Sequence, residues 1–354
     1  MGTLYLLSAR AATDSWRRLH EKSGVGFARE RTITHPVYTL AHLSDSHVTS
    51  VRIPGLRAML NKRILGWCKW SFERRKIHRP EVLDALVADL RITQPDHVAI
   101  TGDLTNLGFA DEFAAAGAWL RQLGDRHYVS LVPGNHDAYV PTPWQSAWAH
   151  WWEYLASDAP HASEATFLHP VSSFQELTEA YFPSVRIRGP LALLGVCTAQ
   201  PVGMFRAGGV VGAPQLARLQ RSLQEFAESD LCRVVLIHHP PQQGDWTLRR
   251  GLADSEALCA ILQNAGAELI LHGHLHETLI EKMSGPAGLI PVVGVRSASD
   301  IGHRPHRNAQ YHLYRIERRR HEPSVRRFRI VMETREYDTA SGSFRIAGEQ
   351  ELQP

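Results

Sequence analysis

Cysteine is scarce in this sequence, and its spacing excludes a Cys-x-x-Cys metal or redox motif. The four cysteines are Cys68, Cys197, Cys232 and Cys259. Cys197 and Cys232 lie in or beside apolar strand-like runs, where buried free thiols are expected. This usage predicts a reducing, cytoplasmic setting.

Long apolar runs are also lacking. No run approaches the ~20 residues that a membrane-spanning helix needs. The first residues have no basic start and Arg10 ends their apolar part, so no signal peptide is expected. Internal repeats and low-complexity segments are absent from the sequence. With 44% apolar and 21% charged residues over 354 positions, the composition predicts a globular protein of one large domain or two small ones.

The net charge is small, at +3, but it is unevenly distributed. The segment 51–79 contains nine basic residues and one acidic residue, Glu73, so its net charge is +8 and that of the remaining chain is −5. The nine are Arg52, Arg57, Lys62, Arg63, Lys69, Arg74, Arg75, Lys76 and Arg79.

The same segment has an apolar helical face and permits two interpretations. The face consists of Leu56, Met59, Leu60, Ile64, Trp67 and Trp70. Leu65 and Phe72 fall outside it, and Arg63 falls inside it. One interpretation is a helix that packs on the core with solvated cations outside. The other is an interfacial helix that docks on an anionic membrane surface.

Apolar strands alternate with amphipathic helices after an N-terminal arm, residues 1–36, that has no sustained pattern. Helices are predicted at 80–90, 110–123, 213–228 and 254–264. Strands are predicted at 38–44, 97–101, 128–132, 191–197, 233–237, 268–271, 289–295, 311–316, 325–332 and 343–346. The alternation predicts one α/β domain over 37–354, in which antiparallel strands at 300–354 close the C-terminal part.

Residues 138–190 interrupt this alternation. They are rich in aromatic residues, among them Trp144, Trp148, Trp151, Trp152, Tyr154, Phe174, Tyr181 and Phe182. We interpret the segment as an inserted cap or lid beside the site. The alternative is a helical excursion that closes the core.

A polar cluster follows each of five predicted strands. The clusters are Asp45-x-His47, Gly102-Asp103, Gly134-Asn135-His136-Asp137, His238-His239-Pro240 and Gly273-His274-x-His276. Aligned strand ends bring such clusters to one edge of a sheet. Their carboxylates, amide oxygen and imidazoles suit two divalent ions if one carboxylate bridges and water completes the coordination. The neighbouring glycines allow the backbone to turn sharply or to pass close to an ion.

With these five blocks the sequence resembles the calcineurin-like metallophosphoesterase superfamily, whose signature is D-x-H, G-D, G-N-H-[DE], a His before Pro, and G-H-x-H. The resemblance runs from about residue 39 to 300. It implies an α/β fold, a four-layer αββα sandwich, here with the inserted helical cap. It also implies a hydrolase with two divalent metal ions (Mn, Fe, Zn or Mg) at the C-terminal edge of the sheets.

The resemblance implies the metal ligands as well. One ion is expected to be held by Asp45, His47 and His276, and the other by Asn135, His238 and His274, with Asp103 bridging. His238 is chosen over His239 because family members carry His-x-Pro at this place. His239 then becomes a residue that orients the ligands.

The resemblance assigns acid catalysis to the third block. His136 is expected to contact the phosphate and to protonate the leaving oxygen, while Asp137 orients His136 and favours its protonated form. Two metal ions would activate a water molecule near neutral pH and neutralise charge on the phosphate oxygens.

The substrate is less narrowly defined than the reaction. The second and fourth blocks and the downstream segment 293–299 look most like the bacterial class III phosphodiesterase branch. Members that act on UDP-2,3-diacylglucosamine combine the same core with basic, apolar elements like 51–79. The better-known pyrophosphatase branch has Gly-Asn-Arg-Asp where this chain has Gly-Asn-His-Asp, although another branch retains Gly-Asn-His-Asp.

We therefore expect hydrolysis of a phosphodiester or pyrophosphate bond, in a lipid-linked nucleotide at the inner face of a membrane. The first alternative is a soluble 3',5'-cyclic-nucleotide phosphodiesterase, and a nuclease is a further one. Nucleic-acid binding alone is not expected, because it would leave Leu56, Met59, Leu60 and Ile64 unexplained. The sequence does not predict the oligomeric state.

Overall fold

The computed structural model describes residues 37–48, 51, 55, 61–158, 181–244, 247–304, 306–319 and 327–352. The chain divides into the units Met1–Pro36 and Val37–Pro354, and all described residues belong to the second. The predicted arm at 1–36 lies outside the described residues, as do Leu56, Met59 and Leu60. Among the described helices, none has the length and apolar character that crossing a membrane requires.

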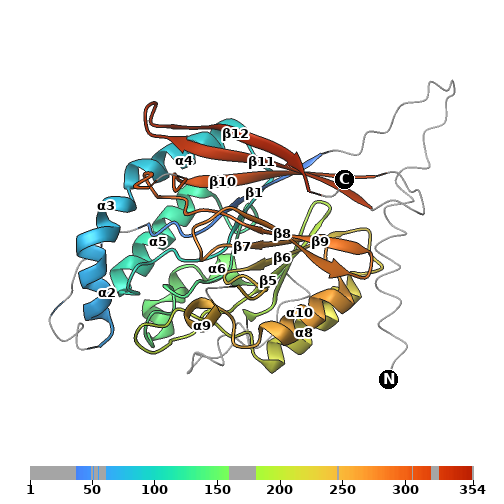
Figure 1. Ribbon diagram of the computed structural model, residues 1–354, viewed down its shortest axis with the longest axis horizontal. Coiled ribbons are helices and arrows are strands. Elements are labelled where there is room, and N and C mark those ends of the chain that lie inside the picture. The colour runs from blue at the N-terminus through green and yellow to red at the C-terminus, as the bar shows by residue number, and fades with distance from the viewer. Residues whose placement is uncertain are drawn as a thin grey trace. The chain divides into compact units, whose positions relative to one another are not determined.

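Two six-stranded sheets form the centre of the second unit (Figure 1). In the first sheet the order is β12-β11-β10-β1-β2-β3, with β1, β2 and β3 parallel and β10 antiparallel to β1. Its strands are β1 (Tyr38–Leu43), β2 (His97–Ile100), β3 (Val129–Leu131), β10 (Gln310–Arg318), β11 (Phe328–Asp338) and β12 (Ser343–Glu351). The three parallel strands therefore end at one edge, where three of the polar clusters begin.

The second sheet has the order β4-β5-β6-β7-β9-β8, and its four inner strands are parallel. Its strands are β4 (Ser184–Arg188), β5 (Leu191–Val196), β6 (Cys232–Ile237), β7 (Leu269–His272), β8 (Leu279–Gly285) and β9 (Gly288–Gly294). The edge strands β4 and β8 were not predicted, because the charged residues in both obscure the apolar alternation. All four cysteines are free, and Cys197 and Cys232 are buried as expected.

Alternating side chains of β5 show how the layers are stacked. Leu191 and Leu193 belong to a core shared with β1–β3 and with the helices over the first sheet. Ala192, Leu194 and Val196 belong to a second core, which α8 and α10 cover. Because neighbouring residues of a strand face opposite sides, the order is helices, sheet, sheet, helices. The predicted four-layer αββα sandwich is confirmed.

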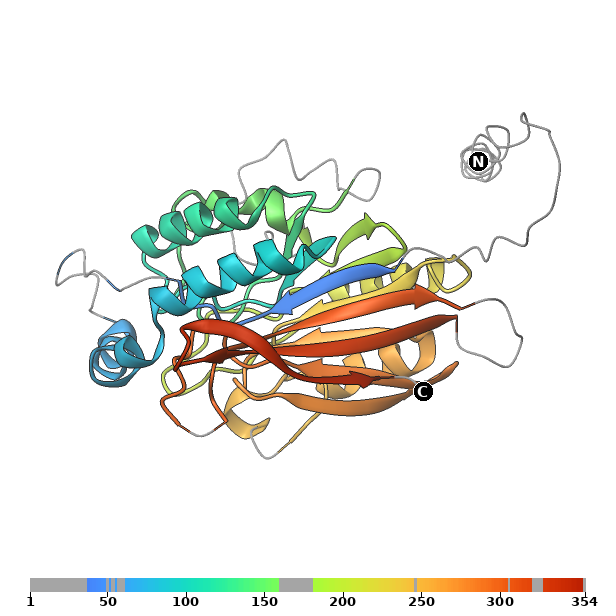
Figure 2. The ribbon, with the colours of Figure 1, turned by 90° about the horizontal axis from the view of Figure 1, so that it is seen from above.

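The helices of the outer layers match the predicted periodicity. Figures 1 and 2 show α4 and α5 running over one sheet. The longer helices are α4 (Pro80–Thr93), α5 (Ala110–Leu123), α8 (Ala213–Glu225) and α10 (Ser255–Ala265). The short ones outside 61–79 are η3 (Trp144–Ser146), η4 (Trp148–His150), α6 (Trp152–Leu155) and α9 (Thr247–Arg250). Pro80 occupies the first turn of α4, where its missing N–H is not needed.

Several described aromatic residues of 138–190 pack in the core, but residues 159–180 lie outside the described part of the chain, so the cap or lid over 138–190 stays a prediction. Trp148, Trp151 and Tyr154 have exposed fractions of 2%, 0% and 1%, and they pack in the core that contains Phe113 of α5. The Trp148 Nε1–H donates to the carbonyl of Asp137 at 2.9 Å. For these three residues the packing favours the alternative, an excursion that closes the core. Phe174 lies outside the described residues.

The basic segment forms a helical stretch made of α2 (Arg63–Lys69), η2 (Trp70–Arg74, a π-helix) and α3 (Arg75–Ile77). Trp67 and Trp70 pack against Val51, Leu107 and Phe109, and only 7% of Trp70 is exposed. Leu65 and Phe72, outside the predicted face, are 42% and 76% exposed, and Ile64, within that face, is 51% exposed. The tryptophans therefore attach this stretch to the domain and do not face a membrane.

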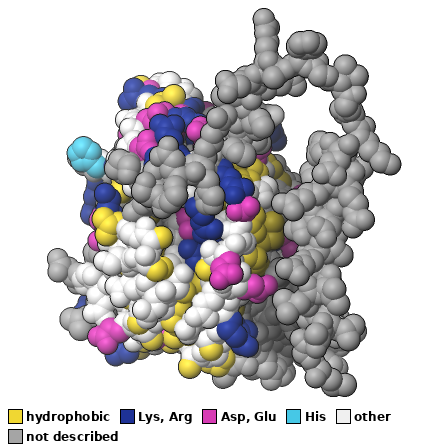
Figure 3. Space-filling view, turned by 90° about the vertical axis from the view of Figure 1, so that its right-hand side faces the viewer, with side chains coloured by type: hydrophobic (Ala, Val, Ile, Leu, Met, Phe, Trp, Pro, Cys, Tyr) yellow, Lys and Arg dark blue, Asp and Glu magenta, His cyan; other side chains and the backbone are white. Residues whose placement is uncertain are grey.

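Figure 3 shows another face of the molecule, on which dark blue basic and magenta acidic side chains lie next to one another. Near the C-terminal end of β10, Arg318 pairs with Asp230, and Arg319 pairs with Glu351 at 2.6 Å. Exposed pairs of this kind contribute little to stability, about 0–1 kcal/mol each. These pairs balance the charge near the end of β10, in contrast with the excess positive charge of 51–79.

Candidate metal centre

The five polar clusters meet at one edge of the two sheets, as predicted. Within the first sheet, the Asp45 N–H donates to the carbonyl of Gly102 at 2.9 Å. Between the sheets, His238 Nδ1 lies 2.6 Å from the carbonyl of Thr101. Within the second sheet, the Gly273 N–H donates to the carbonyl of His238 at 3.0 Å. These hydrogen bonds therefore hold the loops to one another without an ion.

Asp45, His47 and His276 form one group whose candidate ligand atoms lie within 4.8 Å of one another. His276 Nε2 is 3.1 Å from Asp45 Oδ1. The His47 Nδ1–H donates to the carbonyl of Thr105 at 2.9 Å, which leaves Nε2 as the nitrogen with a lone pair. That buried Nε2 has no hydrogen-bond partner among the described residues.

A second group of side chains surrounds Nε2 of His238. Asn135 Oδ1 lies 3.1 Å from this nitrogen, His274 Nδ1 lies 3.3 Å from it, and Asp103 Oδ2 lies 3.5 Å from it. The Nδ1–H of His238 is committed to Thr101, so Nε2 carries the lone pair in the neutral ring. An imidazole held in this way by a carbonyl is the usual arrangement of a metal-binding histidine.

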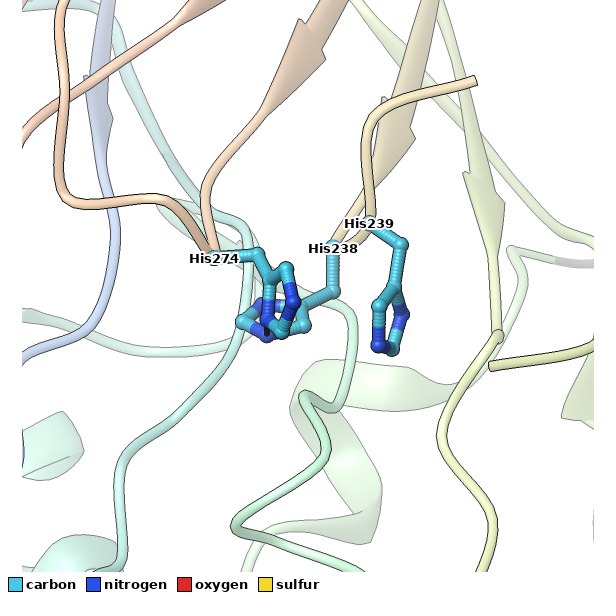
Figure 4. A group of neighbouring side chains, drawn as sticks. All are labelled: His238, His239 and His274. Carbon is cyan, nitrogen blue, oxygen red and sulfur yellow. Dashed lines mark hydrogen bonds between the residues drawn. The ribbon is translucent and has the colours of Figure 1, made fainter. Parts of the chain in front are cut away.

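His239 lies close to His238 and His274, and their candidate ligand atoms are also within 4.8 Å (Figure 4). Both of its ring nitrogens have partners, however. Nδ1 accepts from Thr198 Oγ1 at 2.7 Å, and Nε2 donates to the carbonyl of Ala207 at 2.9 Å. His239 therefore has no lone pair left for an ion, whereas His238 does.

The charges of the centre favour a cation. Although burial would raise it, His276 with His238 and His47 hold the pKa of Asp45 well below its usual range. Burial lowers the pKa of His238, but Asp103 outweighs it and raises that pKa to about 9. The raised pKa of His238 reports a negative field at its ring, and the lowered pKa of Asp45 keeps that carboxylate charged. A divalent ion would satisfy the same field, and the oxygen and imidazole donors suit a first-row or hard divalent metal.

Five of the predicted ligands have backbone φ angles in the left-handed region. They are Asp45 (52°), His47 (41°), Asp103 (56°), His274 (71°) and His276 (54°). Such angles are uncommon for residues with a Cβ, and they cluster at functional sites. At Gly134 a Cβ atom would collide with Asp103 Oδ1 and the Asp103 backbone, so only glycine fits there. The backbone is therefore locally strained at these positions, and this conformation directs the ligand side chains toward one another.

Asp137 lies beside the centre but does not orient His136, contrary to expectation. One or other of its carboxylate oxygens accepts the backbone N–H groups of Asp103, Leu104, Thr105 and Gly134 at 2.9–3.0 Å. Burial and the neighbouring Asp103 raise the pKa of Asp137 to about 7. Asp137 therefore joins two loops. The sequence could not distinguish this role, because its partners are backbone groups.

His136 is oriented by a carbonyl. Its Nδ1–H donates to the carbonyl of Asn106 at 2.5 Å, and its ring stacks on Tyr139 with centroids 5.5 Å apart. Burial, and after it Arg74, lower the pKa of His136 well below its usual value. The expected stabilisation of the protonated form by Asp137 is therefore not found. Asp103 is the nearby charge that raises this pKa.

Two residues of the basic segment also line the centre, and the sequence analysis missed their role. Arg74 Nη1 lies 2.8 Å from His136 Nε2. The ring of His78 lies 4.4 Å from that of His47, and its Nδ1 is 2.8 Å from Ser299 Oγ. The only sequence feature that pointed to this segment was its run of basic residues, and such a run is also typical of a solvated helix.

Comparisons with known proteins bear on the family and the fold. The sequence profile described as calcineurin-like phosphoesterase matches residues 38–278. A dimetal phosphatase from Danio rerio has 13% identity and a TM-score of 0.51, over 90% of this chain and 99% of that one. Purple acid phosphatase PPD1 from yellow lupin (Lupinus luteus) has 11% identity and a TM-score of 0.51, over 90% of this chain and 54% of that one. No curated protein matches the sequence significantly.

Proposed function

The chain belongs to the calcineurin-like phosphoesterase family and is a metal-dependent phosphoester hydrolase, and we propose that it uses two divalent ions to hydrolyse a phosphodiester or pyrophosphate bond. The proposed ligands are Asp45, His47 and His276 for one ion, and Asn135, His238 and His274 for the other, with Asp103 shared. One observation carries this proposal. The candidate atoms of Asp45, Asp103 and His238 lie within 4.8 Å of one another, so the two groups join at Asp103.

When bound, the two ions would activate water and neutralise charge on the phosphate oxygens. The chain's own residues hold and orient the reactants. His136 directs Nε2 away from Asn106, since its Nδ1–H is bonded there. An anionic phosphate beside this ring favours its protonated form and offsets the effect of Arg74. We propose that Nε2–H then donates to the leaving oxygen.

The proposed substrate is amphiphilic, namely a lipid-linked nucleotide such as UDP-2,3-diacylglucosamine. The support is three exposed apolar side chains on two segments that touch. On the helical stretch Ile64 is 51% and Phe72 is 76% exposed, and on the loop after Val202 Phe205 is 77% exposed. Lys62 Nζ joins the segments by donating to the carbonyl of Val202 at 2.8 Å. Exposed apolar side chains beside a polar centre are typical of a site for a partly apolar ligand.

A substrate panel tests this proposal. We expect the metal-loaded protein to hydrolyse bis(p-nitrophenyl) phosphate faster than p-nitrophenyl phosphate, and the lipid-linked nucleotide faster than 3',5'-cyclic AMP. The reverse preference in the second pair would favour the soluble cyclic-nucleotide phosphodiesterase. Cleavage of single-stranded DNA ahead of all of these would favour the nuclease.

Membrane docking is part of the same proposal and has its own test. Phe72→Ser combined with Lys76→Glu should weaken salt-sensitive binding to phosphatidylglycerol vesicles and leave hydrolysis of the soluble diester unchanged. Lys62 is unsuitable for this test, because it bonds to Val202 and lies over the Tyr139 ring. Absence of vesicle binding at low salt would show that the helical stretch serves only as a wall of the site.

A further inference from the structure

The π-helical turn η2 brings one arginine of the basic segment into the metal centre. Arg74 is the last residue of this turn, and π-turns inside helices occur frequently at functional sites. Before it, Trp70 packs on Leu107 and Phe109. After it, the Arg79 N–H donates to the carbonyl of Ser299 at 3.0 Å. The backbone on both sides of Arg74 is therefore attached to the domain.

A second contact holds the beginning of the helical stretch. Arg63 donates from Nε to the carbonyl of Leu107 at 2.9 Å and from Nη2 to the carbonyl of Gly108, and its guanidinium lies 4.3 Å from the Phe109 ring centre. Arg63 is therefore a structural residue. Arg74, farther along the same stretch, makes no such backbone contact among the described residues.

The guanidinium of Arg74 lies over the face of His136. Nη1 is 2.8 Å from Nε2 and 3.3 Å from Nδ1 of the ring. Distances this similar place the guanidinium above the imidazole, because an approach in the ring plane along Nε2 would leave Nδ1 much farther away. Nδ1 also already serves Asn106. The imidazole of His136 therefore does not accept an in-plane hydrogen bond from the guanidinium of Arg74.

No carboxylate among the described residues forms an ion pair with Arg74. Burial lowers the pKa of Arg74, and the nearby carboxylates of Asp103 and Asp45 act in the opposite direction. A guanidinium has five N–H donors in a planar fork. A partly buried guanidinium without an anionic partner raises the free energy of the folded state. The fork matches the geometry of phosphate oxygens. An anion that entered the centre between His136 and Asp103 would therefore meet these donors.

We propose that Arg74 is a catalytic residue of this enzyme that binds a non-bridging oxygen of the substrate phosphoryl group, beside the leaving oxygen served by His136. This inference rests on the proposed phosphoesterase function and adds a residue to it. During in-line displacement, charge spreads over the equatorial phosphoryl oxygens, and a fixed guanidinium stabilises it. The basic segment then contributes directly to the reaction.

The experiment compares Arg74→Ala and Arg74→Lys with the matched control Arg75→Ala. Arg75 is exposed on the same helical stretch, and its removal changes the net charge equally. We measure metal content, kcat and KM on bis(p-nitrophenyl) phosphate, and the affinity for inorganic phosphate by titration calorimetry. Arg74→Ala should keep its metal, lose ~10²–10³-fold in kcat and bind phosphate at least ~10-fold more weakly. Arg74→Lys should recover part of both, and added methylguanidine should partly rescue Arg74→Ala.

The outcomes separate the two proposals. If Arg74→Ala matches Arg75→Ala in kcat, KM and phosphate affinity, the role of Arg74 is overturned. If Arg74→Ala loses its metal and methylguanidine restores nothing, Arg74 is structural and the proposal is likewise overturned. If the wild type binds phosphate through Arg74 but hydrolyses no phosphoester, the proposed function fails and the anion site stands.

Discussion

The backbone N–H of His136 donates to Asp103 Oδ1 at 2.7 Å, while the other oxygen of Asp103 faces His238 Nε2 at 3.5 Å. One carboxylate therefore connects the loop that carries the proposed acid with the group of proposed metal ligands. Because Oδ1 is held by the backbone, Oδ2 keeps a fixed direction toward the centre. Four expectations follow from this arrangement and from the buried groups around it.

Removal of the proposed acid should affect chemistry and leave the metal in place. His136 lies beside the ligands, so His136→Ala should retain both ions and lower kcat by ~10²–10⁴. A diester with a very good leaving group should suffer least, since its leaving oxygen barely needs a proton. The measurement is kcat for a series of aryl diesters, together with metal content. Loss of metal would instead place His136 among the ligands.

Asp137 should be a stability residue more than a catalytic one. Asp137→Ala leaves the backbone N–H groups of Asp103, Leu104, Thr105 and Gly134 without their acceptor. We expect a loss of about 3 kcal/mol or more in the free energy of unfolding. Asp137→Asn, which keeps one acceptor oxygen, should lose less. Urea unfolding measures both, and a normal unfolding midpoint with a low kcat would restore the expected role in orienting His136.

These two residues also mark the limit of sequence analysis. Asp45, Asp103 and His274 were found because each follows an apolar strand within a short local motif, and parallel strand ends must meet. His136 is oriented by the backbone carbonyl of Asn106, and because every residue has this group, the sequence gives no sign of the contact. Arg74 looked like part of a solvated charge run, and Trp148 looked like part of a lid. The positions of Arg74 and Trp148 depend on packing between segments far apart in the chain, and the periodicity of apolar residues does not reveal such packing.

Buried histidines should make the fold sensitive to acid. Burial, together with Arg188 and Arg186, lowers the pKa of His97 to about 3. Its neutral ring donates to the carbonyl of His127 at 3.1 Å and accepts from Ser130 Oγ at 2.8 Å. Below about pH 6.5 the unfolded chain binds a proton that the folded chain does not bind. Stability is therefore fully present above about pH 6.5 and is lost as the pH falls toward 3.

This group alone should remove ~1.4 kcal/mol from the free energy of unfolding per pH unit, or about 2 kcal/mol between pH 6.5 and 5.0. His97→Gln should show a pH slope that is smaller by this amount, although the variant is less stable at pH 7.5. The measurement is urea unfolding at several pH values with metal content held constant. Equal slopes in the variant and the wild type would mean that His97 is protonated in the folded state.

The central claim is a centre of two ions joined by Asp103, and metal analysis of Asp103→Asn tests it most directly. The amide can still accept the His136 N–H, so the loop should keep its conformation and the variant should keep its circular dichroism spectrum. The side chain loses its negative charge, however, at the position that the two ions would share. We predict two ions per wild-type chain by elemental mass spectrometry, fewer than two in Asp103→Asn, and loss of turnover. Two ions and near-normal turnover in that variant would contradict the account.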